Sequence, residues 1–285
     1  MLGATSYFPT PFPGETLYSL CARFHQVSAS DNPLRTRKAL GCDRTCFGFA
    51  DVPIACQNLI TKTALGHSIS LPHLIERHTW LPYFSPFLSE PQLESCLAAT
   101  SSTRRKRSLG FYLSTHGQLR GKYCEECIVQ DNIEAGQPYW HREHQPAGVF
   151  VCNRHRCLLR VMDDVWLKNH IQFLTLPDHP SIKAHSAPAR CANSALLQDI
   201  AGLTERLINH ELPLERLRVD GRASLTLVRA TEAIAAQLPF WGEFRFLALE
   251  PAGFLQRPIR QVLNGDKQYH HPLLHIIVGL ASQSC

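Results

Sequence analysis

The sequence has no long apolar run and relatively few charged residues. Charged residues make up 19% of the 285 residues and hydrophobic residues 44%, a balance that excludes wholesale disorder. The longest apolar stretch, near residues 273–281, is interrupted by His275 and falls well short of the roughly 20 residues that span a membrane. No basic segment precedes an apolar one in the first ten residues, so no signal peptide is expected.

The common catalytic motifs are also missing. The chain contains no G-x-x-x-x-G-K-[ST] phosphate loop, no G-x-G-x-x-G turn, no H-E-x-x-H helix and no G-x-S-x-G elbow. His141 and Glu143 have the H-x-E spacing of zinc deaminases. However, Cys152 follows valine rather than proline and comes too early for the P-C-x-x-C that this fold needs. We therefore expect no enzyme, although scattered carboxylates leave a metal-dependent nuclease open.

Cysteine is plentiful by comparison. The chain has 11 cysteines, an odd number, and no export signal, so a set of disulfides is not expected. A reduced cytosolic protein fits this count better, and in such a protein a close cysteine pair more often marks a metal site than a bridge.

Two short motifs offer four metal ligands. Cys124 and Cys127 form C-x2-C, and after 24 intervening residues Cys152 and His155 form C-x2-H. Zinc takes four such donors in a tetrahedron, and each two-residue gap lets both members of a pair reach one ion. The spacing predicts a structural Zn²⁺ site with no open position for catalysis.

Other cysteines and histidines are alternatives. His141, His144 or Cys157 could replace one of the four ligands, and the two histidines could instead pack, cap or meet phosphate. Cys42 and Cys46 form a weaker pair with no matching pair nearby, so we expect them to be buried core residues.

Helical periodicity dominates both ends of the chain. In the N-terminal part we expect helices near 15–28, 34–40 and 71–79, and a capping box at Ser89 predicts another to about residue 101. In the C-terminal part we expect helices from about 196, over 224–238, and near 253–263 and 272–282. The predicted fold is mainly α: a helical N-terminal domain (1–115), a zinc-binding module (116–177), a linker (178–194) and a helical C-terminal domain (195–285).

The formal charge of +5 is concentrated in one region. Residues 101–160 hold 10 Lys and Arg against 5 Asp and Glu, whereas the rest of the chain holds 19 of each. Basic side chains beside a small zinc fold can neutralise phosphates, so this region is the candidate contact with DNA. The candidate residues are Arg104, Arg105, Lys106, Arg107, Arg120, Lys122, Arg142, Arg154 and Arg156.

Several segments, taken in order, resemble the TniQ/TnsD family of transposon target-selection proteins. Residues 12–24 (FPGETLYSLCARF) are similar to the family's N-terminal signature, and residues 123–127, 139–145 and 148–155 to its zinc segment. Residues 77–87 resemble the stretch before that segment in the TnsD branch, and residues 257–260 and 271–275 are loosely similar to a later motif.

The resemblance implies a non-catalytic adaptor of the bacterial cytoplasm and nucleoid. Such proteins recognise target DNA, or an RNA-guided CRISPR complex, and recruit a TnsC-type AAA+ ATPase. It also implies helix-turn-helix elements and places the metal ligands at Cys124, Cys127, Cys152 and His155. A zinc-containing transcription regulator is an alternative, and a homodimer is left open. The Pro-rich entry into the first helix is the candidate surface for the ATPase, with Phe8, Pro9, Phe12, Pro13 and Tyr18 as its residues.

Overall fold

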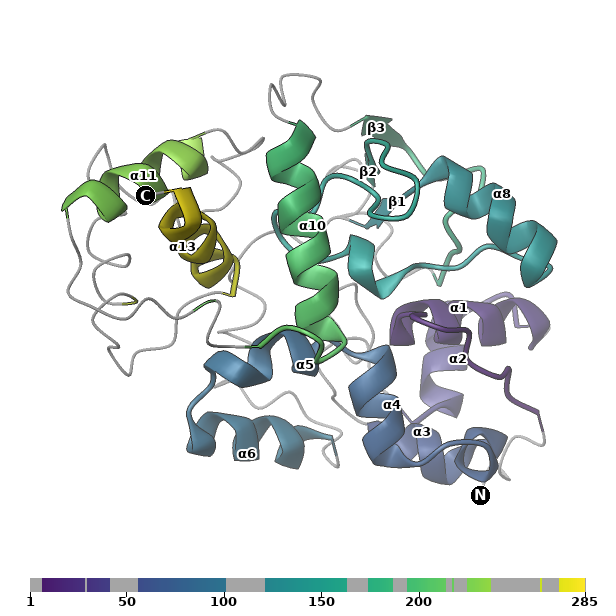
Figure 1. Cartoon of the computed structure of the whole chain (residues 1–285). Helices are drawn as coiled ribbons and strands as arrows, with labels where there is room; N and C mark the ends of the chain where they lie inside the picture. The colour runs from purple at the N-terminus through teal and green to yellow at the C-terminus, as the bar shows by residue number, and fades with distance from the viewer. Residues whose placement is uncertain are drawn as a thin grey trace.

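The chain folds into a mainly helical structure with one small sheet (Figure 1). The computed structural model describes residues 7–28, 30–41, 56–100, 121–162, 174–186, 194–213, 217, 225–236, 262 and 272–284. The α-helices are α1 (Leu17–Val27), α2 (Pro33–Ala39), α3 (Cys56–Lys62), α4 (Leu71–His78), α5 (Leu81–Phe84), α6 (Glu90–Ala99), α8 (Glu125–Glu134), α10 (Ser194–Ile208), α11 (Leu225–Ala236) and α13 (Pro272–Ser284). The 3-10 turns are η1 (Ala64–His67), η2 (Ser85–Phe87) and η3 (Arg142–His144). In these ranges no helix is long and apolar enough to cross a membrane.

The N-terminal helices begin at the residues whose side chains cap them. The Thr16 hydroxyl accepts a hydrogen bond from the Ser19 amide at 3.1 Å, so α1 starts at Leu17. Ser70 caps α4 in the same way, and Ser89 with Gln92 forms the capping box of α6. These caps satisfy amides that have no partner within the helix. The four helices predicted before residue 102 are confirmed, each to within about two residues.

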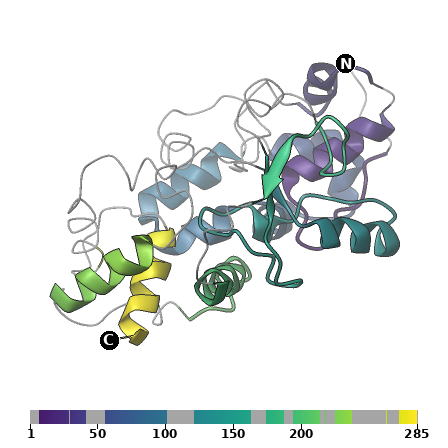
Figure 2. The same ribbon diagram turned by 90° about the horizontal axis from the view of Figure 1, so that it is seen from above.

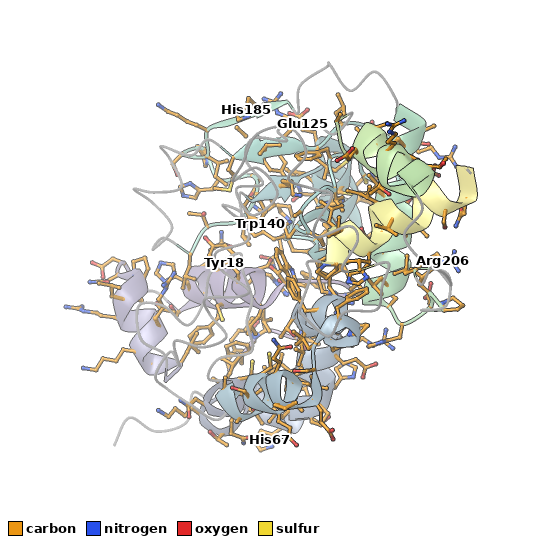
Figure 3. All side chains as sticks on the ribbon, turned by 90° about the vertical axis from the view of Figure 1, so that its left-hand side faces the viewer. Tyr18, His67, Glu125, Trp140, His185 and Arg206 are labelled. Carbon is orange, nitrogen blue, oxygen red and sulfur yellow. The ribbon has the colours of Figure 1, made fainter. Side chains whose placement is uncertain are left out.

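Helix α1 is the centre of the main core. Eight of its 11 residues are buried, and Tyr18 and Trp140 meet edge to face with ring centroids 6.5 Å apart (Figure 3). The Thr175 backbone joins both rings, because its amide donates to the Tyr18 hydroxyl at 3.2 Å and its carbonyl accepts from the Trp140 indole at 2.7 Å. The first helix is therefore packed against segments more than 100 residues away in the sequence.

The sheet is antiparallel and joins three distant segments in the order β1-β2-β3. Its strands are β1 (Lys122–Tyr123), β2 (Arg160–Met162) and β3 (Ala184–Ser186). Val161 is paired with Lys122 on one side and with His185 on the other. Strand β3 lies in the segment that the sequence predicts to be a linker, so part of that segment is an edge strand of the sheet.

Helix α10 lies between the pair α11 and α13 and the part that carries the sheet, in both views (Figures 1 and 2). It contacts α5, η3 and α13, while α11 packs on α13. Leu273, Ile276 and Ile277 of α13 belong to the same core cluster as α1. The helices predicted from 196, over 224–238 and over 272–282 are confirmed as α10, α11 and α13. Apart from residue 262, the helix predicted near 253–263 lies outside the described residues. So do the pair Cys42 and Cys46 and the basic residues Arg104, Arg105, Lys106, Arg107 and Arg120.

Candidate metal centre and its surroundings

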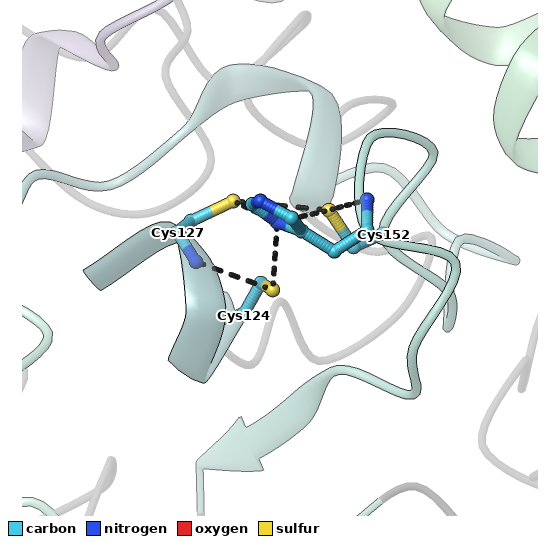
Figure 4. Close-up of side chains that lie close together, drawn as sticks. Cys124, Cys127 and Cys152 are labelled. Atoms are coloured by element: carbon cyan, nitrogen blue, oxygen red, sulfur yellow. Dashed lines mark hydrogen bonds between the residues drawn. The ribbon is translucent and has the colours of Figure 1, made fainter. Parts of the chain in front are cut away.

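Two local turns bring the four predicted ligands together. Cys124 is the N-cap of α8, and its Sγ accepts from the Cys127 amide one turn later at 3.4 Å. Cys152 and His155 occupy a tight turn that the Arg156 amide closes on the Cys152 carbonyl at 2.7 Å. The donor atoms of all four residues lie within 4.8 Å of one another (Figure 4).

Four of the six distances between donor atoms are those expected around a tetrahedral zinc ion. With Zn–S near 2.3 Å and Zn–N near 2.05 Å, a regular tetrahedron places two sulfurs about 3.8 Å apart and a sulfur and a nitrogen about 3.5 Å apart. The Cys127 and Cys152 sulfurs are 3.7 Å apart. His155 Nδ1 lies 3.5, 3.3 and 3.7 Å from the sulfurs of Cys124, Cys127 and Cys152. The cluster could therefore hold a metal ion with all four protein donors in its coordination sphere, and its donor set is compatible with zinc.

The alternative ligands have other positions. Cys157 Sγ is 3.4 Å from Cys124 Sγ but is not part of the four-residue group, and it is more exposed than the three cysteines of the group. His141 is turned toward two carboxylates, with Nε2 2.9 Å from Asp131 and Nδ1 3.2 Å from Glu143. Among the described residues, the Cys124–Cys127–Cys152–His155 group is the one set of His, Cys, Asp and Glu side chains that converges in this way.

Neighbouring residues orient the imidazole and shield the sulfurs. Nε2 of His155 donates to Gln130 Oε1 at 3.2 Å, which leaves the lone pair of Nδ1 facing the sulfurs. A small apolar cluster surrounds the three cysteines and consists of Val149, Leu159 and, from α10, Ala201. Burial of this kind keeps water away from the donors and connects the cluster to helix α10.

Residues 6–159 match the family model TniQ, which is more than half of the chain. The chain belongs to the TniQ family. The TniQ domain is associated with target-site selection in DNA transposition. No curated protein matches the chain.

Within this TniQ chain, two predicted DNA contacts are interior residues instead. The Lys122 ammonium donates to the carbonyls of Pro146 and Val149 at 2.6 and 2.7 Å. The Arg142 guanidinium donates to carbonyls of α4 and its C-cap and to Asn209. Both side chains are at most 5% exposed, so they serve backbone carbonyls rather than phosphates, which corrects the prediction for these two residues.

Arg154 and Arg156 keep the exposure that a DNA contact needs. They flank His155 in the metal-site turn, and both side chains face solvent. Arg156 has a positive φ of 55°, a conformation that the tight turn imposes on it. Of the predicted basic residues that the structure describes, these two remain available to phosphates.

The predicted partner surface at the start of the TniQ match is largely interior. Tyr18 is fully buried, and Phe8 stacks on Phe24 at 5.0 Å and is 7% exposed. Pro9 is buried as well, whereas Phe12 is half-buried and Pro13 is exposed. The prediction is therefore wrong for Phe8, Pro9 and Tyr18, because the aromatic residues that make the pattern conspicuous form the core.

A buried charged cluster that the sequence does not predict lies beside the cysteines, at Asp131, His141 and Glu143. Burial disfavours the charged form of His141, but hydrogen bonds to Asp131 and Glu143 outweigh it and raise its pKa to about 9. The protonated His141 side chain therefore connects Asp131 of α8 to the backbone around His141, which is hydrogen-bonded to the residues that precede α1. A short H-x-E motif at 141–143 was visible in the sequence, but its carboxylate partner ten residues upstream was not.

A second buried ion pair fixes the entry to α1. Arg23 Nη1 lies 2.7 Å from Glu15 Oε2, and both side chains are almost fully buried. The Arg23 guanidinium also covers the Phe12 ring at 3.5 Å from its centroid. The Pro-rich segment before α1 is thus held against the helix by the Glu15–Arg23 ion pair.

Proposed function

We propose that this TniQ protein is a non-catalytic targeting adaptor of DNA transposition. It binds target DNA at the bacterial nucleoid, or a complex already bound there, and recruits an AAA+ ATPase of the TnsC type that directs insertion. The observation that carries the proposal is the TniQ match over residues 6–159, which includes both α1 and the Cys/His cluster. Backbone hydrogen bonds join the two parts, from Thr16 to the Trp140 carbonyl and from Arg142 to the Gly14 carbonyl at 2.9 and 2.7 Å.

In this proposal a zinc ion has a structural role. Cys124, Cys127, Cys152 and His155 would fill a tetrahedral coordination sphere, leaving no position for water or substrate. The ion would fasten the start of α8 to the turn that carries Arg154 and Arg156. These two arginines, with the basic run at residues 104–107, would then contact the DNA backbone without reading its sequence.

Within the family we propose the TnsD-like branch, in which DNA sequence selects the target. The support is the similarity of residues 77–87 to that branch. Recruitment to DNA that depends on an RNA-guided CRISPR complex would place the chain outside it.

A mobility-shift series with the zinc-loaded chain, target DNA and the ATPase tests the proposal. The chain is expected to bind DNA with an affinity that falls steeply between about 50 and 200 mM salt. The ATPase, supplied with a non-hydrolysable ATP analogue, should join the DNA only when the chain is present. Cleavage of supercoiled DNA that needs magnesium and a single carboxylate would indicate a nuclease instead. Operator binding without any ATPase recruitment would indicate a transcription regulator.

A further inference from the structure

Helix α8 has two faces of opposite character. Its inner face holds Cys127 and Asp131, both at most 3% exposed, next to the buried N-cap Cys124. Its outer face carries Val129 and Ile133, which are 62% and 80% exposed. Because they are four residues apart, the two aliphatic side chains lie next to each other one helical turn apart.

This exposed pair is unusual for the molecule. Single exposed aliphatic residues are common on protein surfaces and need no explanation. Among the described residues, Val27, Leu97 and Leu158 are such cases, and none has another large exposed aliphatic residue within four positions of it. Val129 and Ile133 instead form an apolar strip on α8. This helix lies at the outer edge of the molecule (Figures 1 and 2).

Acidic side chains flank the strip at the start of the helix. Glu125 and Glu126, four and three residues before Val129, are both exposed, and the helix itself contains no lysine or arginine. Glu125 pairs with Arg160, whose Nε lies 3.6 Å from its carboxylate, whereas Glu126 has no ion-pair partner among the described residues. Negative charge beside the strip repels nucleic acid, so this face does not suit DNA. It suits an apolar depression of a protein whose rim carries lysine and arginine.

The helix is also held rigidly in place. The cysteine cluster fixes its first turn, and the contact between Asp131 and the His141 cation at 2.9 Å fixes its middle. A side-chain strip on a helix held at two points loses little conformational freedom on binding, which favours affinity.

We infer that this acidic–apolar face of α8, formed by Glu125, Glu126, Val129 and Ile133, is the docking surface for the AAA+ ATPase. The inference rests on the proposed function and moves the docking surface away from the N-terminal entry, where Phe8, Pro9 and Tyr18 are interior. The occupant is a protein surface that pairs an apolar depression with basic residues.

Binding of the ATPase to the immobilised, zinc-loaded chain tests the inference. The double variant Val129→Ser/Ile133→Ser removes the strip and should weaken binding by at least about 10-fold, because the loss of even one of the two aliphatic contacts is worth about that factor. Val27→Ser is the matched control, since it removes an aliphatic side chain that is 57% exposed on α1, and it should leave the affinity within about 2-fold. Glu126→Lys should weaken binding most at low salt.

The outcomes separate the inference from the proposed function. If wild type binds the ATPase and the double variant binds equally well, the α8 surface is wrong while the adaptor function stands. If wild type itself fails to bind the ATPase, recruitment is wrong and the docking surface falls with it. If sedimentation shows a wild-type dimer that the double variant abolishes without any change in ATPase affinity, the occupant is a second copy of the chain and the inference is overturned.

Discussion

Replacing an arginine by methionine should mainly lower the stability of the fold at position 142 and mainly weaken DNA binding at position 154. Arg142 is 3% exposed, and Nη2 donates to Asn209 Oδ1 at 3.1 Å while Nη1 donates to the Thr79 carbonyl at 3.3 Å and to the Glu76 carbonyl. A methionine side chain has a similar length but donates no hydrogen bond to these acceptors.

The loss can be estimated from the bonds. A hydrogen bond from a charged donor contributes about 1.5–3 kcal/mol, and each buried acceptor left without a donor costs about 1–3 kcal/mol. We therefore expect Arg142→Met to lower the free energy of unfolding by about 3–5 kcal/mol, with a shift of the urea midpoint as the measurement. Arg154→Met removes an exposed side chain and should change that free energy by less than about 0.5 kcal/mol.

Binding to DNA should respond in the reverse order. If Arg154 contacts a phosphate, Arg154→Met reduces the slope of log K against log salt by about one, because each neutralised phosphate releases close to one counterion. Measured below its unfolding transition, Arg142→Met should keep the wild-type slope. An Arg142→Met protein with wild-type stability and a reduced slope would refute the interior assignment.

Three further changes test other parts of the structure. Gly148→Ala should lower the free energy of unfolding by about 2–4 kcal/mol in urea titrations, because φ is +86° and a Cβ would lie 2.6 Å from Leu273 of α13. Gly136→Ala is the control: its φ is +75° but the space around it is open, so it should lower that free energy by only about 1 kcal/mol. Metal analysis should find one zinc per chain, retained in Cys157→Ser and lost with the fold of the module in Cys124→Ser, whereas two equivalents in wild type would implicate another site. Burial lowers the pKa of His78 from 6.5 to about 4, because the folded protein favours the neutral imidazole. Up to about 3 kcal/mol of the free energy of unfolding should therefore be lost as the pH falls from 6.5 to 4. Urea midpoints measured over this pH range should show a smaller loss for His78→Asn.

Local signals in the sequence predict most of the α-helices, although not α3, α5 or α8, and they predict which four side chains converge in the candidate metal site. Ser70 and Ser89 act on amides within three residues of themselves, so the starts of α4 and α6 can be read without knowing the rest of the fold. The four candidate ligands are two local pairs, and the sequence does not show how the two pairs meet. The structure brings them within 4.8 Å.

The sequence does not reveal which of the predicted DNA-binding and partner-binding side chains are exposed to solvent. Lys122 and Arg142 are basic residues beside the candidate metal site, as a DNA contact would be, but their partners are backbone carbonyls and an asparagine side chain 24 to 67 residues away in the sequence. The same holds for Tyr18, whose hydroxyl reaches Thr175. A residue type and its neighbours do not reveal such distant partners, so the charge pattern could suggest the region of the DNA contact but not its members.

Helix α1 also has a consequence for synthesis of the protein. Tyr18 is covered by Thr175, which follows it by 157 residues, and Ser19 bonds to Trp140, which follows by 121. At roughly 5–20 residues per second, the ribosome needs about 10–30 s to make the residues that cover the helix. During that time the nascent chain exposes the face of α1 that the folded protein buries. Chaperone capture of the growing N-terminal part should therefore be strong, and a chain released before residue 140 should aggregate.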